Sequence, residues 1–280
     1  MTLLGAAQIR ELAAQLDLKP SKSLGQNFVI DSNVCTKIVR TAGVTSDDIA
    51  LEIGPGLGSL TLAMLEVAKS VIAVEIDPRL AQQLPLTVAT HFEHPENLTV
   101  INKDALAVHD LPVAPTVLVA NLPYNVSVPV LLHLLEKFPT LRTGVVMVQA
   151  EVADRLAAKP GGKEYGIPSV KAAWWADVKN VGTVSRSIFW PAPNVDSKLV
   201  GFTRRATAGS EESRAKVFTI IDAAFAQRRK MLRSALSGLY GSSSAAEAIL
   251  IKAGIDPTLR GEALQVESFC KIAAVAPDIF

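Results

Sequence analysis

Three glycines at alternate positions, Gly54, Gly56 and Gly58, follow Glu52 at the end of an apolar run. The next residues, 60–65, have apolar positions that suit a helix. A strand that enters a helix through such a turn has no side chain between its backbone and a ligand. The spacing G-x-G-x-G differs from the G-x-G-x-x-G of dinucleotide sites, which hold a pyrophosphate. The turn therefore suits a nucleotide-type cofactor without phosphates, although an ordinary tight turn has the same composition.

Two carboxylates follow later apolar runs. Glu75 ends the run that starts at Val71 and stands 21 positions after Gly54, where a doubly wound sheet presents an acceptor to ribose hydroxyls. Asp104 comes just after a third run, Leu98–Ile101. Its carboxylate can accept a hydrogen bond from the exocyclic amine of an adenine, and it can equally cap a helix. The sequence leaves both roles of Asp104 open.

The apolar run 116–120 leads directly into Asn121, Leu122, Pro123 and Tyr124. Asn and Pro favour turns, so this segment can simply end a strand. Its place at the end of the fourth strand, beside the cofactor seat, argues for more than a turn. An amide, a backbone stiffened by proline and an aromatic ring together form a small binding site that suits a planar amine.

The order of apolar patterns predicts the fold. Strand-like and helix-like runs alternate, which is typical of a parallel sheet with helices on both faces. The loop 159–166 has the Gly and Lys content of a mobile segment. We predict strands at 49–53, 71–75, 98–101, 116–120, 144–149, 169–175, 178–184 and 197–203, and helices at 9–16, 59–66, 78–86, 126–138 and 151–158.

A change in composition marks a domain boundary. Residues 207–210 are small and polar, and every apolar pattern after them is helical. We therefore expect a catalytic domain at 1–206 that includes an N-terminal lid segment, and a smaller helical domain at 207–280. Asp31 is expected to cap a helix that ends near Gly43. The segment around Asn27 is either a connector or a lid over the cofactor.

Charge and composition exclude several classes of protein. The net charge of +1 rules out a uniformly basic, nucleic-acid-coating surface, so local clusters matter more. Arg228, Arg229, Lys230 and Arg233 form one such cluster, which is either a solvated helix face or a phosphate-binding surface. The two cysteines are far apart, and the four histidines form no metal-ligand pattern. We expect no metal and no disulfide.

The chain contains no 18-residue apolar stretch, and its first twenty residues carry charges rather than the pattern of a secretion signal. These features predict a cytoplasmic protein without a membrane segment.

Taken in order along almost the whole chain, these segments resemble one family, the S-adenosylmethionine-dependent rRNA adenine dimethyltransferases of the KsgA type. The resemblance implies an α/β, Rossmann-like methyltransferase domain followed by a smaller all-helical domain. It also implies N6,N6-dimethylation of two adjacent adenosines in the 3′-terminal hairpin of small-subunit (16S) rRNA, with a role in small-subunit biogenesis. The matching segments are 23–28, 52–58, Glu75, Asp104, 121–124, 165–166, 189–197 and 228–233.

The resemblance assigns roles to particular residues. The Asn121 side-chain oxygen and the Leu122 carbonyl would accept hydrogen bonds from the two protons of the target adenine's exocyclic amine. Because this amine is a weak nucleophile, catalysis would consist mostly of positioning it. Tyr124 and Phe189 would stack on the two faces of the flipped base. The cofactor would contact Asn27, Val29, Gly54, Glu75, Asp104 and Asn121, and rRNA phosphates would contact Arg228, Arg229, Lys230 and Arg233. The expected partner is small-subunit rRNA in a pre-assembled 30S particle, bound by a monomer.

Two departures from the family pattern stand out. Val184-Ser185-Arg186 replaces the frequent Val-Pro-Pro ahead of Phe189, which predicts a less rigid approach to that residue, and Val29 replaces a usual Leu. Met231 and Leu232 are expected to face inward from a helix that carries the basic cluster.

Three other functions compete with this one. A methyltransferase of the same architecture that modifies large-subunit rRNA and confers macrolide resistance is the nearest alternative. A non-catalytic ribosome-assembly or transcription factor on the same fold is the second, and the intact glycine turn argues against it. An NAD-dependent dehydrogenase fits least, given the glycine spacing.

Overall fold

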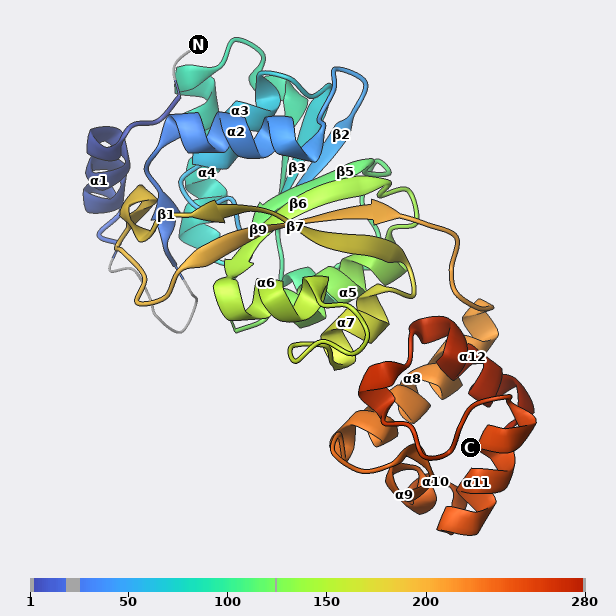
Figure 1. The fold of residues 1–280 in the computed structure, drawn as a ribbon. Helices are drawn as coiled ribbons and strands as arrows, with labels where there is room; N and C mark the ends of the chain where they lie inside the picture. The colour runs from blue at the N-terminus through green and yellow to red at the C-terminus, as the bar shows by residue number, and fades with distance from the viewer. Residues whose placement is uncertain (1–2, 19–25, 124, 279–280) are drawn as a thin grey trace. The chain divides into compact units, whose positions relative to one another are not determined.

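The structure is a computed structural model that describes residues 3–18, 26–123 and 125–278. The chain forms two compact units (Figure 1). The first comprises residues 1–153 and 179–204, and the second comprises 154–178 and 205–280. Most of the sheet belongs to the first unit, and the second is largely helical.

The larger sheet has seven strands within the described residues, and its order sets the place of the site. Five strands are parallel, and the sixth, β9, pairs antiparallel with β6. The order reverses at β2, so the carboxyl ends of β2 and β5 flank a crevice of the kind that binds ligands in open α/β sheets. Across the sheet the strands are β4 (Leu98–Asn102), β3 (Ser70–Glu75), β2 (Ile49–Ile53), β5 (Val117–Asn121), β6 (Thr143–Gln149), β9 (Ser197–Arg204) and β7 (Ala176–Val184).

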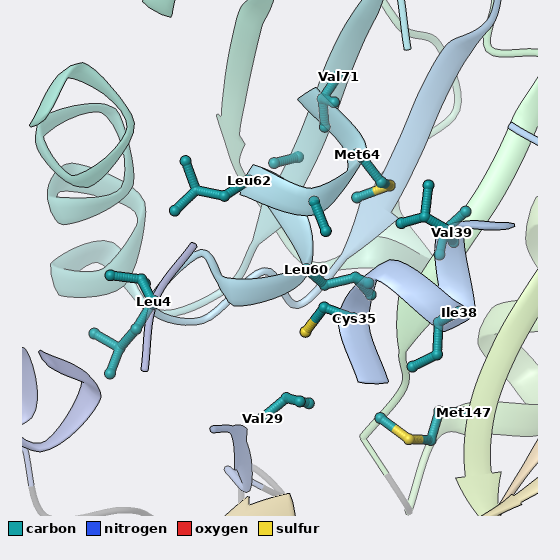
Figure 2. Packing of buried hydrophobic residues seen from close by; sticks show 14 of the residues in the cluster. Leu4, Val29, Cys35, Ile38, Val39, Leu60, Leu62, Met64, Val71 and Met147 are labelled. Carbon is teal, nitrogen blue, oxygen red and sulfur yellow. The ribbon is translucent and has the colours of Figure 1, made fainter. Parts of the chain in front are cut away.

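Both faces of this sheet are buried. Val119 and Met147 lie in a cluster with side chains of the helices that precede and follow β2 (Figure 2). Their neighbours Leu118 and Val146 project to the opposite face, since successive side chains alternate in a strand, and they are fully buried as well. This double burial explains why the strands are nearly continuous apolar runs.

Helix ends follow local sequence signals. Asp31 accepts hydrogen bonds from the backbone N–H groups of Asn33 and Val34, and Gly43 ends the same helix with a left-handed φ of 69°. Both predicted caps are confirmed. The first unit contains α1 (Ala6–Gln15), α2 (Ser32–Ala42), α3 (Ser59–Leu65), α4 (Pro78–His91), α5 (Ser127–Lys137) and the start of α6 (Ala150–Ala157), with short turns η1 (Pro95–Asn97), η2 (Ala105–Ala107) and η3 (Arg186–Ile188).

A second, two-stranded sheet joins distant parts of the chain. Its strands are β1 (Phe28–Val29) and β8 (Phe189–Trp190), which run antiparallel. The rings of Phe28 and Trp190 stack with centroids 6.3 Å apart. The segment expected to be a lid is therefore paired with the segment expected to face the substrate.

The second unit has its own apolar core. Ile220 and Ile221 of α8, Leu250 of α11 and Phe269 of α12 are fully buried. The predicted all-helical C-terminal portion is confirmed by this arrangement. Its elements are α7 (Ile167–Ala172), α8 (Glu211–Ala226), α9 (Leu232–Ala235), α10 (Ser237–Tyr240), α11 (Ser243–Lys252), η4 (Gly261–Ala263) and α12 (Val266–Val275).

One predicted strand, 169–175, is wrong, because α7 occupies most of it. Pro168 lies in the first turn, where a missing N–H is tolerated, and the Gly166 N–H donates to the Ser169 hydroxyl at 3.1 Å. Trp174 and Trp175 then pack edge-on against the Phe218 ring of α8. Their aromatic character serves packing against a helix rather than a strand.

The division into units differs from the expected boundary at 206/207. Residues 154–178 belong with the C-terminal helices, because Trp174 and Trp175 pack on Phe218 and Tyr165 packs on Phe225. Which domain performs catalysis and which binds RNA stays a prediction.

Helix α4 continues to His91, beyond its predicted end at Leu86, although Pro85 lies inside it. Proline removes one backbone hydrogen bond. Thr87 and Val88 in the final turn are buried, and their packing offsets that loss. Within the described residues, none of the helices combines the length and apolar character needed to cross a bilayer.

Gly144 of β6 provides a test of the sheet's central packing. A Cβ on Gly144 would collide with the Leu118 carbonyl oxygen and would lie 2.6 Å from a ring carbon of Phe202. We expect Gly144→Ala to lower the free energy of unfolding by about 1–3 kcal/mol, measured by urea denaturation. Gly238→Ala is the control, since no atom lies within 4 Å of its added Cβ. Equal stability of the two variants would contradict this packing.

Candidate active site

The glycine turn joins β2 to α3, as the sequence predicts. Gly54, Gly56 and Gly58 have φ values of 69°, 59° and 99°, a region that side chains other than glycine rarely adopt. A Cβ on Gly56 would lie 2.9 Å from the ring of Phe28, and one on Gly58 would lie 2.8 Å from Leu84. The turn therefore needs glycine both for its backbone angles and for its close neighbours.

Glu75 holds this turn in place. One carboxylate oxygen accepts a hydrogen bond from the Gly56 N–H at 3.1 Å, and the other accepts one from the Asp77 N–H at 3.0 Å. Burial raises the pKa of Glu75 above its ordinary value, although the two backbone N–H groups oppose that rise. Glu75, at the end of β3, thus stabilises the glycine turn and also lines a cleft beside it.

Glu52 is a second buried carboxyl of the site. It is 2% exposed and accepts a hydrogen bond from the Thr61 hydroxyl at 2.6 Å. Burial raises the pKa of Glu52 to about 8, and the nearby charge of Glu75 adds to the rise. The sequence reasoning gave Glu52 no role of its own, although its place directly before the glycines was visible.

Asn121 lies beside the glycine turn. Its backbone oxygen is 3.8 Å from the position of a Cβ built on Gly54, and its side-chain NH₂ donates to the Asn27 carbonyl at 3.1 Å. This bond leaves the amide oxygen of Asn121 as an acceptor. Leu122 is 1% exposed, so its side chain serves the core and only its backbone can meet a ligand. Tyr124 lies outside the described residues.

The segment 26–30 is fixed over the turn. The Val29 carbonyl accepts a hydrogen bond from the Ser59 hydroxyl at 2.6 Å, and the Ile30 N–H donates to the Ile188 carbonyl at 2.8 Å. Together with the bond between Asn27 and Asn121, these contacts attach the segment to three other parts of the first unit. Residues 23–25, which also carry the family resemblance, lie outside the described residues.

These elements enclose a cleft of about 930 Å³, part of it open to solvent. Its lining includes every residue predicted to contact a cofactor: Asn27, Val29, Gly54, Glu75, Asp104 and Asn121. The structure therefore places these six residues in one cleft, and their individual roles stay predictions.

Asp104 has both properties that the sequence left open. One carboxylate oxygen accepts from the Leu106 N–H at 2.9 Å and caps η2, while the residue is exposed and lines the cleft. Sequence reasoning missed Ile76, which is 52% exposed and lines the same cleft. An apolar residue directly after a strand-ending acid is the signal that would have found it.

Phe189 has a different environment from the one expected. Its side chain is 3% exposed, belongs to the apolar cluster and is not among the residues that line the cleft. Polar contacts hold the residues that precede Phe189 in the chain. Arg186 pairs with Asp196 at 3.1 Å, and Ser185 caps η3. These bonds stand where the family pattern often has prolines.

The basic cluster lies in the second unit. Arg228, Arg229 and Lys230 lie in a turn between α8 and α9 rather than on a helix as expected, whereas Arg233 lies on the short α9. Arg228 pairs with Glu262 at 2.7 Å, and Arg233 pairs with Glu247 at 3.2 Å. The neighbouring Arg229 and Lys230 are exposed. Leu232 is fully buried as predicted. The inward orientation predicted for Met231 is wrong, because it is 38% exposed at the start of the short α9.

Within the described ranges, no three His, Cys, Asp or Glu side chains gather in a group suited to a metal ion. The two cysteines, Cys35 and Cys270, are both free thiols.

The reversed strand order, the antiparallel β9 and the glycine turn define a Rossmann-like methyltransferase. Solved structures agree with this class. A dimethyladenosine transferase from Plasmodium falciparum matches with a TM-score of 0.73 and 26% identity over 88% of this chain and 95% of that one. The 23S rRNA methyltransferase ErmE matches with a TM-score of 0.65 and 26% identity over 89% and 98%.

The chain belongs to the ribosomal RNA adenine dimethylase family, whose model matches residues 18–278. A ribosomal RNA small subunit methyltransferase A from Streptomyces griseus is 59% identical over 280 residues, covering 99% of this chain and 96% of the relative. One from Leifsonia xyli is 59% identical over 276 residues, covering 98% and 99%. The predicted family and enzyme class are confirmed by these matches.

The buried Glu52 predicts a dependence of stability on pH. Because its folded pKa of about 8 lies above the ordinary 4.5, the folded state holds the proton more tightly than the unfolded chain does. This contribution is complete below pH 4.5 and is lost as the pH rises to about 8. Between these pH values we expect the free energy of unfolding of the wild-type protein to fall, and we expect this fall to be smaller by a few kcal/mol in Glu52→Gln. Urea denaturation without ligand at each pH measures it.

Glu66→Gln, a change at an exposed carboxyl at the C-terminal end of α3, is the matched control. Glu75 contributes to the decline in the same direction and is retained in both variants. If Glu52→Gln and Glu66→Gln followed the same pH dependence, the assignment of the effect to Glu52 would be wrong.

Proposed function

We propose that this protein uses S-adenosylmethionine to dimethylate N6 of two adjacent adenosines in the 3′-terminal hairpin of 16S rRNA. We further propose that it acts as a cytoplasmic monomer on a pre-assembled 30S particle during small-subunit biogenesis. The observation that carries the proposal is the position of Asn121, beside Gly54 and inside the cleft. The relatives from Streptomyces griseus and Leifsonia xyli, both named for the small subunit, support the choice of substrate.

The alternative of a large-subunit substrate is not favoured. The relatives named for the small subunit are 59% identical, whereas the 23S rRNA methyltransferase structure is 26% identical. A non-catalytic role on the same fold is also not favoured, because the glycine turn, Glu75 and Asn121 are present together in one cleft.

The charges of the cleft support a cationic cofactor. Glu75 and Asp104 line it, and Lys103 is the basic residue among its described lining. Glu52 also lines the cleft, but its pKa of about 8 keeps it mostly protonated near neutral pH, so it adds little charge. Such a wall is unfavourable for a pyrophosphate and complementary to a sulfonium and an ammonium group. When bound, S-adenosylmethionine supplies a methyl group on a sulfonium.

Each predicted cofactor contact has a chemical reason. Glu75 has lone pairs beyond those used by the two backbone N–H groups and would accept from ribose hydroxyls. Asp104 has one oxygen outside the η2 cap and would accept from an adenine amine. Gly54 allows close approach of the methionine portion. Asn27 and Val29 would cover the cofactor, held there by Asn121 and Ser59.

Asn121 and Leu122 would position the target amine. The amide NH₂ of Asn121 is engaged by the Asn27 carbonyl, which directs the amide oxygen to a different partner. That oxygen and the Leu122 carbonyl would accept the two amine protons, so the nitrogen lone pair points at the methyl carbon. Oriented dipoles then stabilise the positive charge that develops on nitrogen, and no strong base is needed.

Two aromatic residues are proposed to stack on the flipped base. Tyr124 lies outside the described residues, and Phe189 is buried. The Phe189 ring must therefore leave the apolar cluster to cover a base. Stacking is worth about 1–3 kcal/mol per base, which offsets much of the cost of unstacking the RNA.

The proposal is tested by incubating the protein with labelled S-adenosylmethionine and undermethylated small subunits, then digesting the RNA. We expect label in N6,N6-dimethyladenosine from two adjacent positions of the 16S hairpin. Label in 23S rRNA supplied alongside, or in no nucleoside, would overturn the proposal.

Asn121→Ala tests the positioning of the amine. We expect methyl transfer to fall by about 10²–10³-fold, the usual effect of removing one oriented group at a developing charge, while binding to small subunits is retained. Asn121→Asp keeps an acceptor oxygen but loses the donor to Asn27, so cofactor binding of both variants is measured by calorimetry. Asn33→Ala, at an exposed asparagine on α2, is the control. Unchanged methylation by Asn121→Ala would exclude this role.

A further inference from the structure

Three loops of the second unit meet beside the basic turn. They are residues 159–166, 227–231 and 256–264. The Gly161 N–H donates to the Glu262 carbonyl at 2.7 Å, and the Leu232 N–H donates to the Leu259 carbonyl at 2.7 Å. The Tyr165 hydroxyl donates to the Leu264 carbonyl at 2.8 Å. The loop 159–166, which looks mobile from its composition, is thus hydrogen-bonded to its neighbours.

Arg228 makes the largest set of contacts at this junction. Its Nε donates to a Glu262 carboxylate oxygen at 2.7 Å, and its terminal NH₂ donates to the carbonyls of Gly162 and Lys163 at 3.2 and 2.5 Å. A planar guanidinium can reach a carboxylate and two carbonyls at once, which the point charge of a lysine cannot do. Most of the Arg228 donors are therefore directed into the protein.

The cations around Arg228 face solvent instead. Lys163, Arg229 and Lys230 are exposed, and their side chains form no hydrogen bond or ion pair with any other described residue. The acids of the three loops are Glu262, which pairs with Arg228 and lies 3.9 Å from Arg260, and the exposed Glu164 and Asp256. The solvent side of the junction is thus predominantly positive.

We infer that Lys163 joins Arg229 and Lys230 in one phosphate-binding face, and that Arg228 is the positioning residue that holds the Lys163 loop in it. We call Lys163, Arg229 and Lys230 the three-cation face. The inference rests on the proposed RNA substrate and extends it, since a polyanionic backbone is the partner that matches several unpaired cations. It gives Lys163 a role in phosphate binding. Arg228, which was expected to contact a phosphate itself, instead holds the loop that carries Lys163.

Salt dependence of binding tests the face. Each phosphate contact that is lost lowers the magnitude of the slope of log K against log salt by about 1. We expect this change for Lys163→Gln and about twice this change for Arg229→Gln/Lys230→Gln, with undermethylated small subunits as the probe. Lys37→Gln, at an exposed lysine of α2 in the first unit, is the matched control. Equal slopes for Lys163→Gln and Lys37→Gln would overturn the inference.

Arg228 is tested by its coupling to Lys163. If Arg228 acts through the loop, Arg228→Gln and Lys163→Gln each reduce the slope, and the double variant reduces it no further. Arg228→Lys, which keeps the charge but not the fork, should behave like Arg228→Gln. Additive changes, or normal binding by Arg228→Lys, would show that Arg228 is an ordinary phosphate contact. An unchanged unfolding transition in urea confirms that both units of the variants are folded.

The outcomes separate this inference from the proposed function. A wild-type protein that methylates 16S rRNA while Lys163→Gln binds normally would leave the function intact and remove Lys163 from the face. A wild-type protein that neither binds nor methylates small subunits would remove the proposed function itself. A Lys163→Gln defect with intact subunits but not with deproteinised 16S rRNA would identify an acidic ribosomal protein as the partner and overturn the RNA assignment.

Discussion

The buried carboxylate of Glu75 is the contact on which the cleft depends. It accepts hydrogen bonds from the N–H groups of Gly56 and Asp77, and so it joins the turn after β2 to the end of β3. A carboxylate 4% exposed is costly to keep charged unless such donors surround it. The left-handed glycines aim one of these donors at the acid, so the turn and the acid stabilise each other. Asn121 lies beside this arrangement, since its backbone oxygen is 3.8 Å from a Cβ built on Gly54.

The short segment 26–30 connects the two sides of the proposed reaction. Through Asn27 it orients the amide of Asn121, and through Val29 it is bonded to Ser59 at the start of α3. The same segment forms β1, whose partner β8 contains Phe189. The segment is therefore bonded both to the cleft residue Asn121 and, through β1, to the strand that contains Phe189.

The second unit shows how a charged motif is divided between structure and surface. In the run Arg228, Arg229 and Lys230, the first side chain is directed into the protein and the next two into solvent. Arg233 likewise pairs with Glu247. The neighbouring loops produce this division, because Glu262 and the carbonyls of Gly162 and Lys163 accept from Arg228. A net charge of +1 is compatible with local cation clusters, because it is a sum over the whole chain and does not fix where the charges lie.

The sequence by itself determined the alternating strands and helices of the first unit, the glycine turn, and the acids and amide at the strand ends. These features are local: each depends on backbone angles or side-chain alternation within a few residues. Tertiary structure alone decided that 167–172 is helical, that residues 154–178 belong with the C-terminal helices, that Phe189 is buried, and which cations are paired. Those outcomes depend on partners such as Phe218 and Glu262, which are far away in the chain. Burial and ion pairing are properties of the partners that folding brings together, and no short pattern encodes them.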